Sequence, residues 1–123
     1  RAALESAAYS IKANMLQLEN VTRQKADAIC IGGGMVNSGL FTNVLANVLD
    51  ADILVLRDRS ASAMGAFVCS MTALGEYDSL SDGAQMARDM LVRISPNDLL
   101  ASEYEDHYNN WLEASSTLDG IKL

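Results

Sequence analysis

Three consecutive glycines, Gly32, Gly33 and Gly34, and the polar pair Asn37 and Ser38 that follows them could bind a ligand. Backbone without Cβ atoms can lie flat against a planar or phosphorylated group, and free amides at a helix N-terminus attract anions. The structural alternative is a tight turn, for which one glycine would suffice. We favour a ligand site, because the glycines follow a strand-like run and open α/β sheets bind ligands at the carboxyl ends of strands.

Neither of two common phosphate-binding motifs accounts for these glycines. The third glycine of a GxGxxG fingerprint would fall at Asn37, and the Gly-Lys-Ser/Thr ending of a Walker loop is missing. A redox α/β domain that binds a dinucleotide is therefore disfavoured.

The remaining reactive residues predict no metal or catalytic site in this chain. Cys30 and Cys69 lie in separate apolar segments without metal-ligand spacing, so we expect both to be small buried residues. His107 has no Cys or His neighbour at zinc spacing and is expected on a helix surface. The 16 Asp and Glu residues fall mostly on polar helix faces and are expected to be solvated.

Composition restricts the possible partners. The chain has 123 residues, of which 50% are hydrophobic, which is typical of one globular domain. With a net charge of −7, the chain lacks the basic surface that is typical of a nucleic-acid-binding protein. It has no membrane-length apolar run and no signal-peptide pattern, so we expect no membrane partner and a cytoplasmic location. Helical periodicity begins directly at Arg1, and we expect the chain to be part of a longer protein.

Hydrophobic spacing predicts the elements that position the glycines. Residues 1–20 are expected to form a helix and residues 26–31 a buried strand, followed by a helix capped by Asn37 or Ser38. Residues 51–56 then form a second strand parallel to the first, as in a strand–helix–strand crossover. Because two strands rarely make a stable sheet, we expect something outside the chain to complete it.

Three more helices are predicted after the second strand. One starts at Ser60 or Ser62 and stops at Gly75, and the next runs from a cap at Ser81 or Asp82 to Ile94. A terminal helix carries an aromatic and apolar stripe that is expected to dock on the rest of the molecule: Tyr104, Tyr108, Trp111, Leu112 and Leu118.

Three segments in this order resemble the C-terminal lobe of the FGGY carbohydrate kinases, which include glycerol kinase, xylulokinase, ribulokinase and gluconokinase. They are an Arg-Ala-x-Leu-Glu helix opening at residues 1–5, the Gly-Gly-Gly turn and helix at 32–49, and an Ala-x-Gly-Ala helix start at 63–66. The resemblance implies an actin-like, ribonuclease-H-like α/β fold with parallel strands flanked by helices. Residues 1–123 would form the C-terminal part of the second domain.

The resemblance also implies a role for the glycines, namely to receive the adenosine of ATP. Gly33 and Gly34 would lie against adenine and ribose, Ser38 would replace an Asn that contacts the nucleotide, and Asn37 is the neighbouring polar candidate. Two positions depart from the family pattern. Met35 stands where Ala is usual, and Asn47 replaces the Asp of Ala-Asp-Val-Leu. Gly65 would mark close packing of another backbone beside the nucleotide cleft.

The implied activity is transfer of the ATP γ-phosphate to a hydroxyl of a sugar, ketose or polyol. By the same resemblance the catalytic Asp, the Mg²⁺ ligands and the sugar site precede these residues, so the chain alone is expected to be inactive. We expect the parent enzyme to be a homo-oligomer. An alternative is a non-catalytic actin-like binding or assembly module, which an N-terminal sequence without a phosphate-binding loop and catalytic Asp would indicate.

Overall fold

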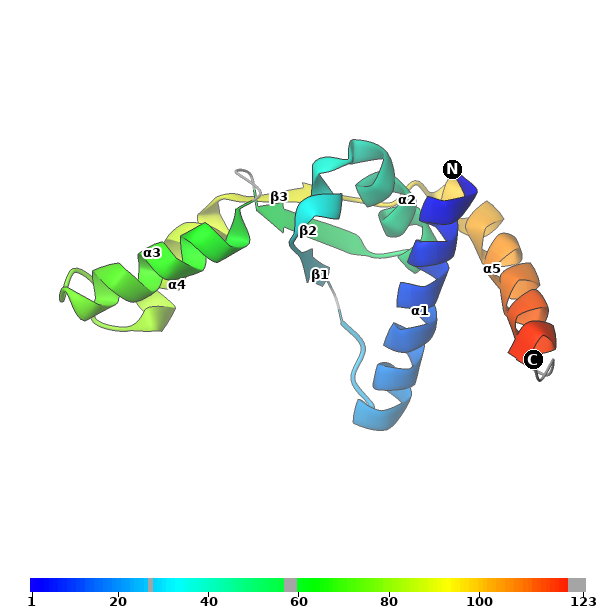
Figure 1. The fold of residues 1–123 in the computed structure, drawn as a ribbon, viewed down its shortest axis with the longest axis horizontal. Helices are drawn as coiled ribbons and strands as arrows, with labels where there is room; N and C mark the ends of the chain where they lie inside the picture. The colour runs from blue at the N-terminus through cyan, green and yellow to red at the C-terminus, as the bar shows by residue number, and fades with distance from the viewer. Residues whose placement is uncertain (27, 57–59, 120–123) are drawn as a thin grey trace.

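The computed structural model describes residues 1–26, 28–56 and 60–119. Three strands form one sheet, helices pack on one of its faces, and a helical hairpin extends away from it (Figure 1). In chain order the elements are α1 (Ala2–Thr22), β1 (Ala28–Ile31), the 3-10 helix η1 (Gly34–Asn37), α2 (Gly39–Leu49), β2 (Asp52–Leu56), α3 (Ala61–Ala73), α4 (Leu80–Asp89), β3 (Leu91–Ile94) and α5 (Asp98–Asp119).

The sheet has the strand order β1-β2-β3. Strand β1 is parallel to β2, with Ile31 opposite Val55, as the crossover pattern predicted. The predicted parallel strands are only part of the sheet, because a third strand that was not predicted, β3, runs antiparallel to β2 within the chain, with Ile94 opposite Ile53. The predicted fourth helix therefore ends at Asp89 rather than at Ile94.

The physical reason is that pairing with β2 outweighs the helical spacing of residues 90–94. Val92 and Ile94 are β-branched and suit a strand, and pairing gives the backbone of this segment its hydrogen bonds. Ile94 also packs against the buried core. Tertiary contacts of this kind routinely override local helix propensity.

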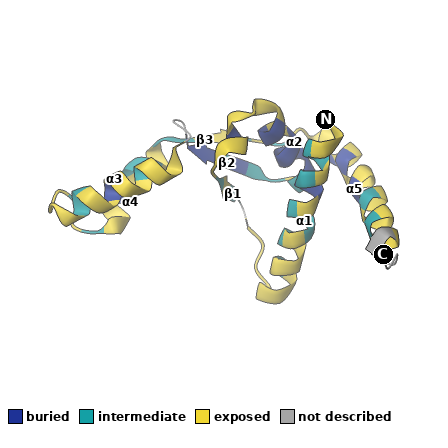
Figure 2. Ribbon diagram, viewed as in Figure 1, coloured by how far each residue is buried: buried dark blue, intermediate teal, exposed yellow. Residues whose placement is uncertain are grey.

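The core lies between α2 and one face of the sheet. Side chains alternate along a strand, so Ile29, Ile31, Ile53, Val55 and Ile94 share the face that packs in the core cluster. Helix α2 is buried through most of its length, and α1 and α5 pack against it. Figure 2 shows this concentration of buried residues and the mostly exposed surface of α3 and α4.

The aromatic part of the predicted stripe of α5 docks on α1, whereas Leu112 is exposed and the side chain of Leu118 lies outside the described residues. Tyr104 and Tyr108 are buried, and their rings and that of Trp111 all lie within 6.5 Å of the Tyr9 ring, centroid to centroid. The predicted apolar face of residues 1–20 is buried only toward its start, since Leu18 is 62% exposed.

The α3–α4 hairpin departs from prediction in its details. Gly75 follows α3 with a φ of +81°, in agreement with the predicted stop, but α4 is capped by Ser79 instead of Ser81 or Asp82. Outside the backbone of α3 itself, no described atom lies within 4 Å of an ideal Cβ on Gly65, so the described residues do not make the close packing predicted there. Gly83 is the tightly packed glycine, since an ideal Cβ would lie 2.7 Å from Val68 Cγ1.

Candidate functional site

The glycine turn, residues 32–38, joins the carboxyl end of β1 to α2, and each of its glycines has a different environment. Gly33 has a φ of +104°, which L side chains rarely adopt, so it meets the conformational need of the turn. A Cβ on Gly32 would lie 3.4 Å from the Cβ of Ala61, so this residue lets α3 begin close to β1. Gly34 has a negative φ, and a Cβ there would meet no described atom within 4 Å. The fold of the described residues therefore does not require glycine at position 34.

Ser38 is the N-cap of α2, which decides between the two predicted capping residues. Its Oγ accepts a hydrogen bond from the backbone amide of Phe41 at 3.3 Å, and its carbonyl accepts one from the amide of Thr42 at 3.1 Å. A capping hydroxyl acts as an acceptor and keeps its own proton as a donor. The cap therefore leaves Ser38 able to donate one hydrogen bond to a ligand.

All four predicted binding residues lie in this one turn, and all four are exposed: Gly33, Gly34, Asn37 and Ser38. Val36 is 4% exposed and fixes η1 against the core. Met35, the departure noted in the sequence, is half exposed. The turn thus has a buried anchor on one side and accessible backbone and polar groups on the other.

A groove of about 500 Å³ begins beside the turn at Gly32 and runs between the strand ends and the α3–α4 hairpin. Its lining is almost entirely apolar and includes Cys30, Met64, Gly65 and Cys69. Both cysteines are exposed, so the prediction that they are buried was wrong. For Cys30 the strand alternation was the missed signal, because its neighbours Ile29 and Ile31 occupy the core face.

The described residues include no group of three or more His, Cys, Asp or Glu side chains that could hold a metal ion. His107 lies on the surface of α5, as predicted, with Nε2 3.7 Å from Glu103 Oε1. None of the described helices is long and apolar enough to cross a membrane.

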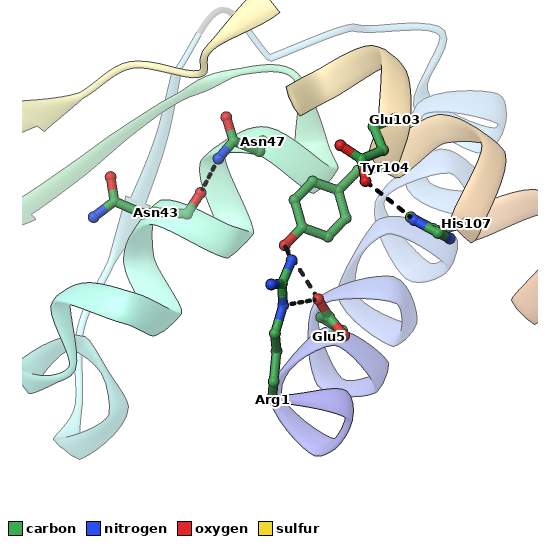
Figure 3. Close-up of polar contacts among 7 residues, drawn as sticks. All are labelled: Arg1, Glu5, Asn43, Asn47, Glu103, Tyr104 and His107. Atoms are coloured by element: carbon green, nitrogen blue, oxygen red, sulfur yellow. Dashed lines mark hydrogen bonds and ion pairs between the residues drawn. The ribbon is translucent and has the colours of Figure 1, made fainter. Parts of the chain in front are cut away.

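A polar cluster between α1 and α5 was not found in the sequence (Figure 3). Arg1 Nε donates to Glu5 Oε1 at 2.8 Å, and the Tyr104 hydroxyl donates to the same oxygen at 3.2 Å. The hydrogen bond from Arg1 lowers the pKa of the Glu5 carboxyl. The spacing of Arg1 and Glu5 could have suggested their pairing, but Tyr104 is 99 residues away from Glu5 and gives no local signal. The cluster gives the Arg-Ala-x-Leu-Glu segment a structural role, because it ties the start of α1 to α5.

Comparison with known proteins places the chain among carbohydrate kinases. L-fuculokinase of Escherichia coli (strain K12) is 32% identical over 79 residues, which are 64% of this chain and 17% of that protein. Ribulokinase 1 of Staphylococcus saprophyticus is 29% identical over 105 residues, 85% of this chain and 20% of the relative. The structure of gluconate kinase from Lactobacillus acidophilus superposes with a TM-score of 0.76 at 22% identity, over 98% of this chain and 24% of that one.

The chain thus spans about a fifth of the length of these curated relatives. The model of the FGGY family of carbohydrate kinases, C-terminal domain, matches residues 1–74, which include α1, the glycine turn and α3. The α/β fold expected for this lobe is the one observed, with a mixed rather than a parallel sheet. The chain belongs to the FGGY family of carbohydrate kinases.

Proposed function

We propose that this chain is the nucleotide-binding portion of an ATP-dependent sugar kinase, which transfers the ATP γ-phosphate to a hydroxyl of a sugar, ketose or polyol. Residues 1–123 would together form the C-terminal part of the second domain, in a cytoplasmic homo-oligomer. Family membership supports kinase activity over the alternative of a non-catalytic assembly module.

The observation that carries the proposal is the glycine turn at the carboxyl end of β1. Gly34 is exposed, and the described fold does not require a glycine at this position. Adenosine presents a flat base and a ribose, and backbone without a Cβ gives such a group the closest approach. Gly33 and Gly34 would lie against the base and ribose, while Ser38 and Asn37 would supply polar contacts.

The phosphoryl transfer itself would depend on residues outside this chain. Mg²⁺, when bound to ATP, would neutralise charge on the phosphates, and a catalytic Asp would orient the acceptor hydroxyl. The magnesium ligands would lie elsewhere in the parent enzyme. We therefore expect the 123-residue chain alone to bind adenosine weakly and to have no sugar kinase activity.

The names of the relatives support the proposed class of acceptor. Proteins named L-fuculokinase, ribulokinase, xylulose kinase and gluconate kinase share this region with the chain. Their names cover different sugars and a sugar acid, so the proposal extends to this class of acceptor and not to one member of it.

Nuclear magnetic resonance of the isotope-labelled chain tests the nucleotide proposal even if binding is weak. With millimolar ATP or adenosine, the amide signals of Gly33, Gly34, Asn37 and Ser38 should shift in a saturable way. Inorganic triphosphate should leave them unchanged, because the proposed contacts are with adenosine. Gly34→Val should abolish the shifts at the other three residues while the chain stays folded.

Gly39→Val is the matched control, since Gly39 also has open space around its Cβ and no positive φ but lies outside the four proposed contacts. It should leave adenosine binding unchanged. The proposal that the turn binds adenosine would be contradicted if the saturable shifts occurred only in amide signals outside the glycine turn. Equal shifts of the turn's signals with triphosphate alone would contradict it as well.

A further inference from the structure

We propose that the hollow between α1 and α5 binds a small organic cation with a guanidinium head, held by the Glu5 carboxylate and the rings of Tyr9 and Trp111. The α1–α5 hollow has a volume of about 420 Å³ and is lined by Ala2, Glu5, Ser6, Tyr9, His107 and Trp111. It lies away from the glycine turn, so this proposal does not rest on nucleotide binding.

The lining combines two features that recognise cations. The Tyr9 and Trp111 side chains both line the hollow, and their ring centroids are 5.9 Å apart with the planes tilted by 44°. Aromatic faces attract a cation through the ring quadrupole, and a planar guanidinium can also stack on them. The Glu5 carboxylate beside the rings can accept a charge-assisted hydrogen bond from a guanidinium.

The same helix pair already holds one of the chain's own cations by a ring and a carboxylate. Lys12 Nζ lies 4.9 Å from the centroid of the Tyr108 ring and forms an ion pair with Glu105. Arg1 donates to Glu5 and to the Tyr104 hydroxyl. Neither Lys12 nor Arg1 lines the α1–α5 hollow.

Glu5 is able to receive a further cation. Its contacts with Arg1 and Tyr104 both involve Oε1, which leaves Oε2 for a ligand among the described residues. The lowered pKa of Glu5 keeps the carboxyl ionised at neutral pH. Figure 3 shows Glu5 on α1 and His107 on α5, and both residues line the hollow. The net charge of −7 also favours cations over anions at this surface.

Trp111 is the chain's single tryptophan, so its fluorescence reports directly on the α1–α5 hollow. The 123-residue chain is titrated with N-methylguanidinium chloride and, separately, with neutral N-methylurea of nearly the same shape, at constant ionic strength. We expect saturable quenching by the cation, with a dissociation constant on the order of 1–10 mM for so small a ligand. N-methylurea should produce no saturable change.

Two variants locate the site. Glu5→Gln should weaken N-methylguanidinium binding by about tenfold, the value of a hydrogen bond to a charged group. Glu113→Gln removes an exposed carboxylate of α5 outside the hollow and should have no effect. Because Glu5→Gln also removes contacts with Arg1 and Tyr104, Ser6→Arg provides a second variant. Its tethered guanidinium should occupy the hollow and prevent binding, whereas Ser6→Gln should not.

Equal quenching by N-methylurea would overturn the proposal, because the hollow would then select shape rather than charge. Unchanged binding in a folded Glu5→Gln variant would also overturn it. If Glu5→Gln unfolds, unchanged binding in Ser6→Arg would have the same consequence. Each of these results would leave the proposed nucleotide site untouched.

Discussion

The side-chain Oδ1 of Asn47 accepts a hydrogen bond from the backbone amide of Asn97 at 2.7 Å, across 50 residues of sequence. Asn47 is 8% exposed, and its Nδ2 donates to the carbonyl of Asn43 at 2.9 Å. Asn97 Oδ1 in turn accepts the amides of Leu99 and Leu100 at the start of α5. The buried amide of Asn47 therefore connects α2 to the segment that starts α5. An aspartate at position 47 could not donate the hydrogen bond to the Asn43 carbonyl.

Asn47→Ala should lower the free energy of unfolding by about 1–3 kcal/mol, because it leaves the Asn97 amide without its buried acceptor. Asn47→Asp keeps that acceptor and should cost less than Asn47→Ala. Urea denaturation of the purified chain measures both. Asn43→Ala is the control, since Asn43 is exposed and its side chain, among the described residues, bonds only to the carbonyl of Gly39. A change of less than about 0.5 kcal/mol in Asn47→Ala would contradict the structural role of this amide.

Gly83→Ala should destabilise the α3–α4 hairpin, whereas Gly65→Ala should not. A Cβ on Gly83 would lie 2.7 Å from Val68 Cγ1 and 2.8 Å from Tyr77 Cδ2, and neither stiff side chain can move away cheaply. Overpacking of this kind costs about 1–3 kcal/mol, which should exceed the gain in helix propensity. Gly65 lies inside α3 with open space around its Cβ, so Gly65→Ala should stabilise by up to about 1 kcal/mol. Thermal unfolding compares the two, and equal melting temperatures would contradict the packing at Gly83.

The chain should lose stability at alkaline pH through the α1–α5 contact. Burial raises the pKa of both Tyr9 and Tyr108, and the nearby carboxylates Glu5 and Glu105 respectively raise it further. The unfolded phenols lose their protons near pH 10, before the folded ones do, so the stabilisation is complete below about pH 10 and falls as the pH rises further.

Urea unfolding at a series of pH values from 8 to 11 checks the alkaline prediction. The double variant Tyr9→Phe, Tyr108→Phe should show a smaller loss of unfolding free energy above about pH 10 than the parent chain. Trp111→Phe changes the same aromatic contact without removing an ionisable group, so its pH dependence should match that of the parent. An identical alkaline loss in the double variant would show that other groups cause it.

Local sequence patterns predicted those elements that pack against neighbours close to them in the sequence. The spacing in residues 1–56 predicted α1, β1, α2 and β2 within two residues at most ends, because each packs against a neighbour close in the sequence, α1 only through its first half. Strand β3 was missed because Met90, Leu91 and Ile94 also fit a helix, and only pairing with distant β2 distinguishes the two. The α4 cap was misplaced for a related reason, since Ser79, Ser81 and Asp82 are equally good caps by type.

The sequence predicted the turn that carries the candidate site, but the contacts around that turn are not contained in sequence spacing. The run of glycines between a predicted strand and a predicted helix indicated a turn that contains Gly33, Gly34, Asn37 and Ser38, and the structure has this turn. The sequence could not show that Gly33 carries the positive φ while Gly34 is open. It also could not bring Tyr104 to Glu5 or Tyr9 to Trp111, because these pairs join the two ends of the chain.

Strands β2 and β3 are antiparallel neighbours, with Leu56 and Leu91 paired at the end where the chain leaves one and enters the other. Antiparallel strands in this relationship can be joined by a loop of two residues, so the sheet does not need the α3–α4 hairpin to close. The hairpin is therefore an insertion between two strands that already pair with each other. A change in the length of the hairpin should therefore leave the register between β2 and β3 intact.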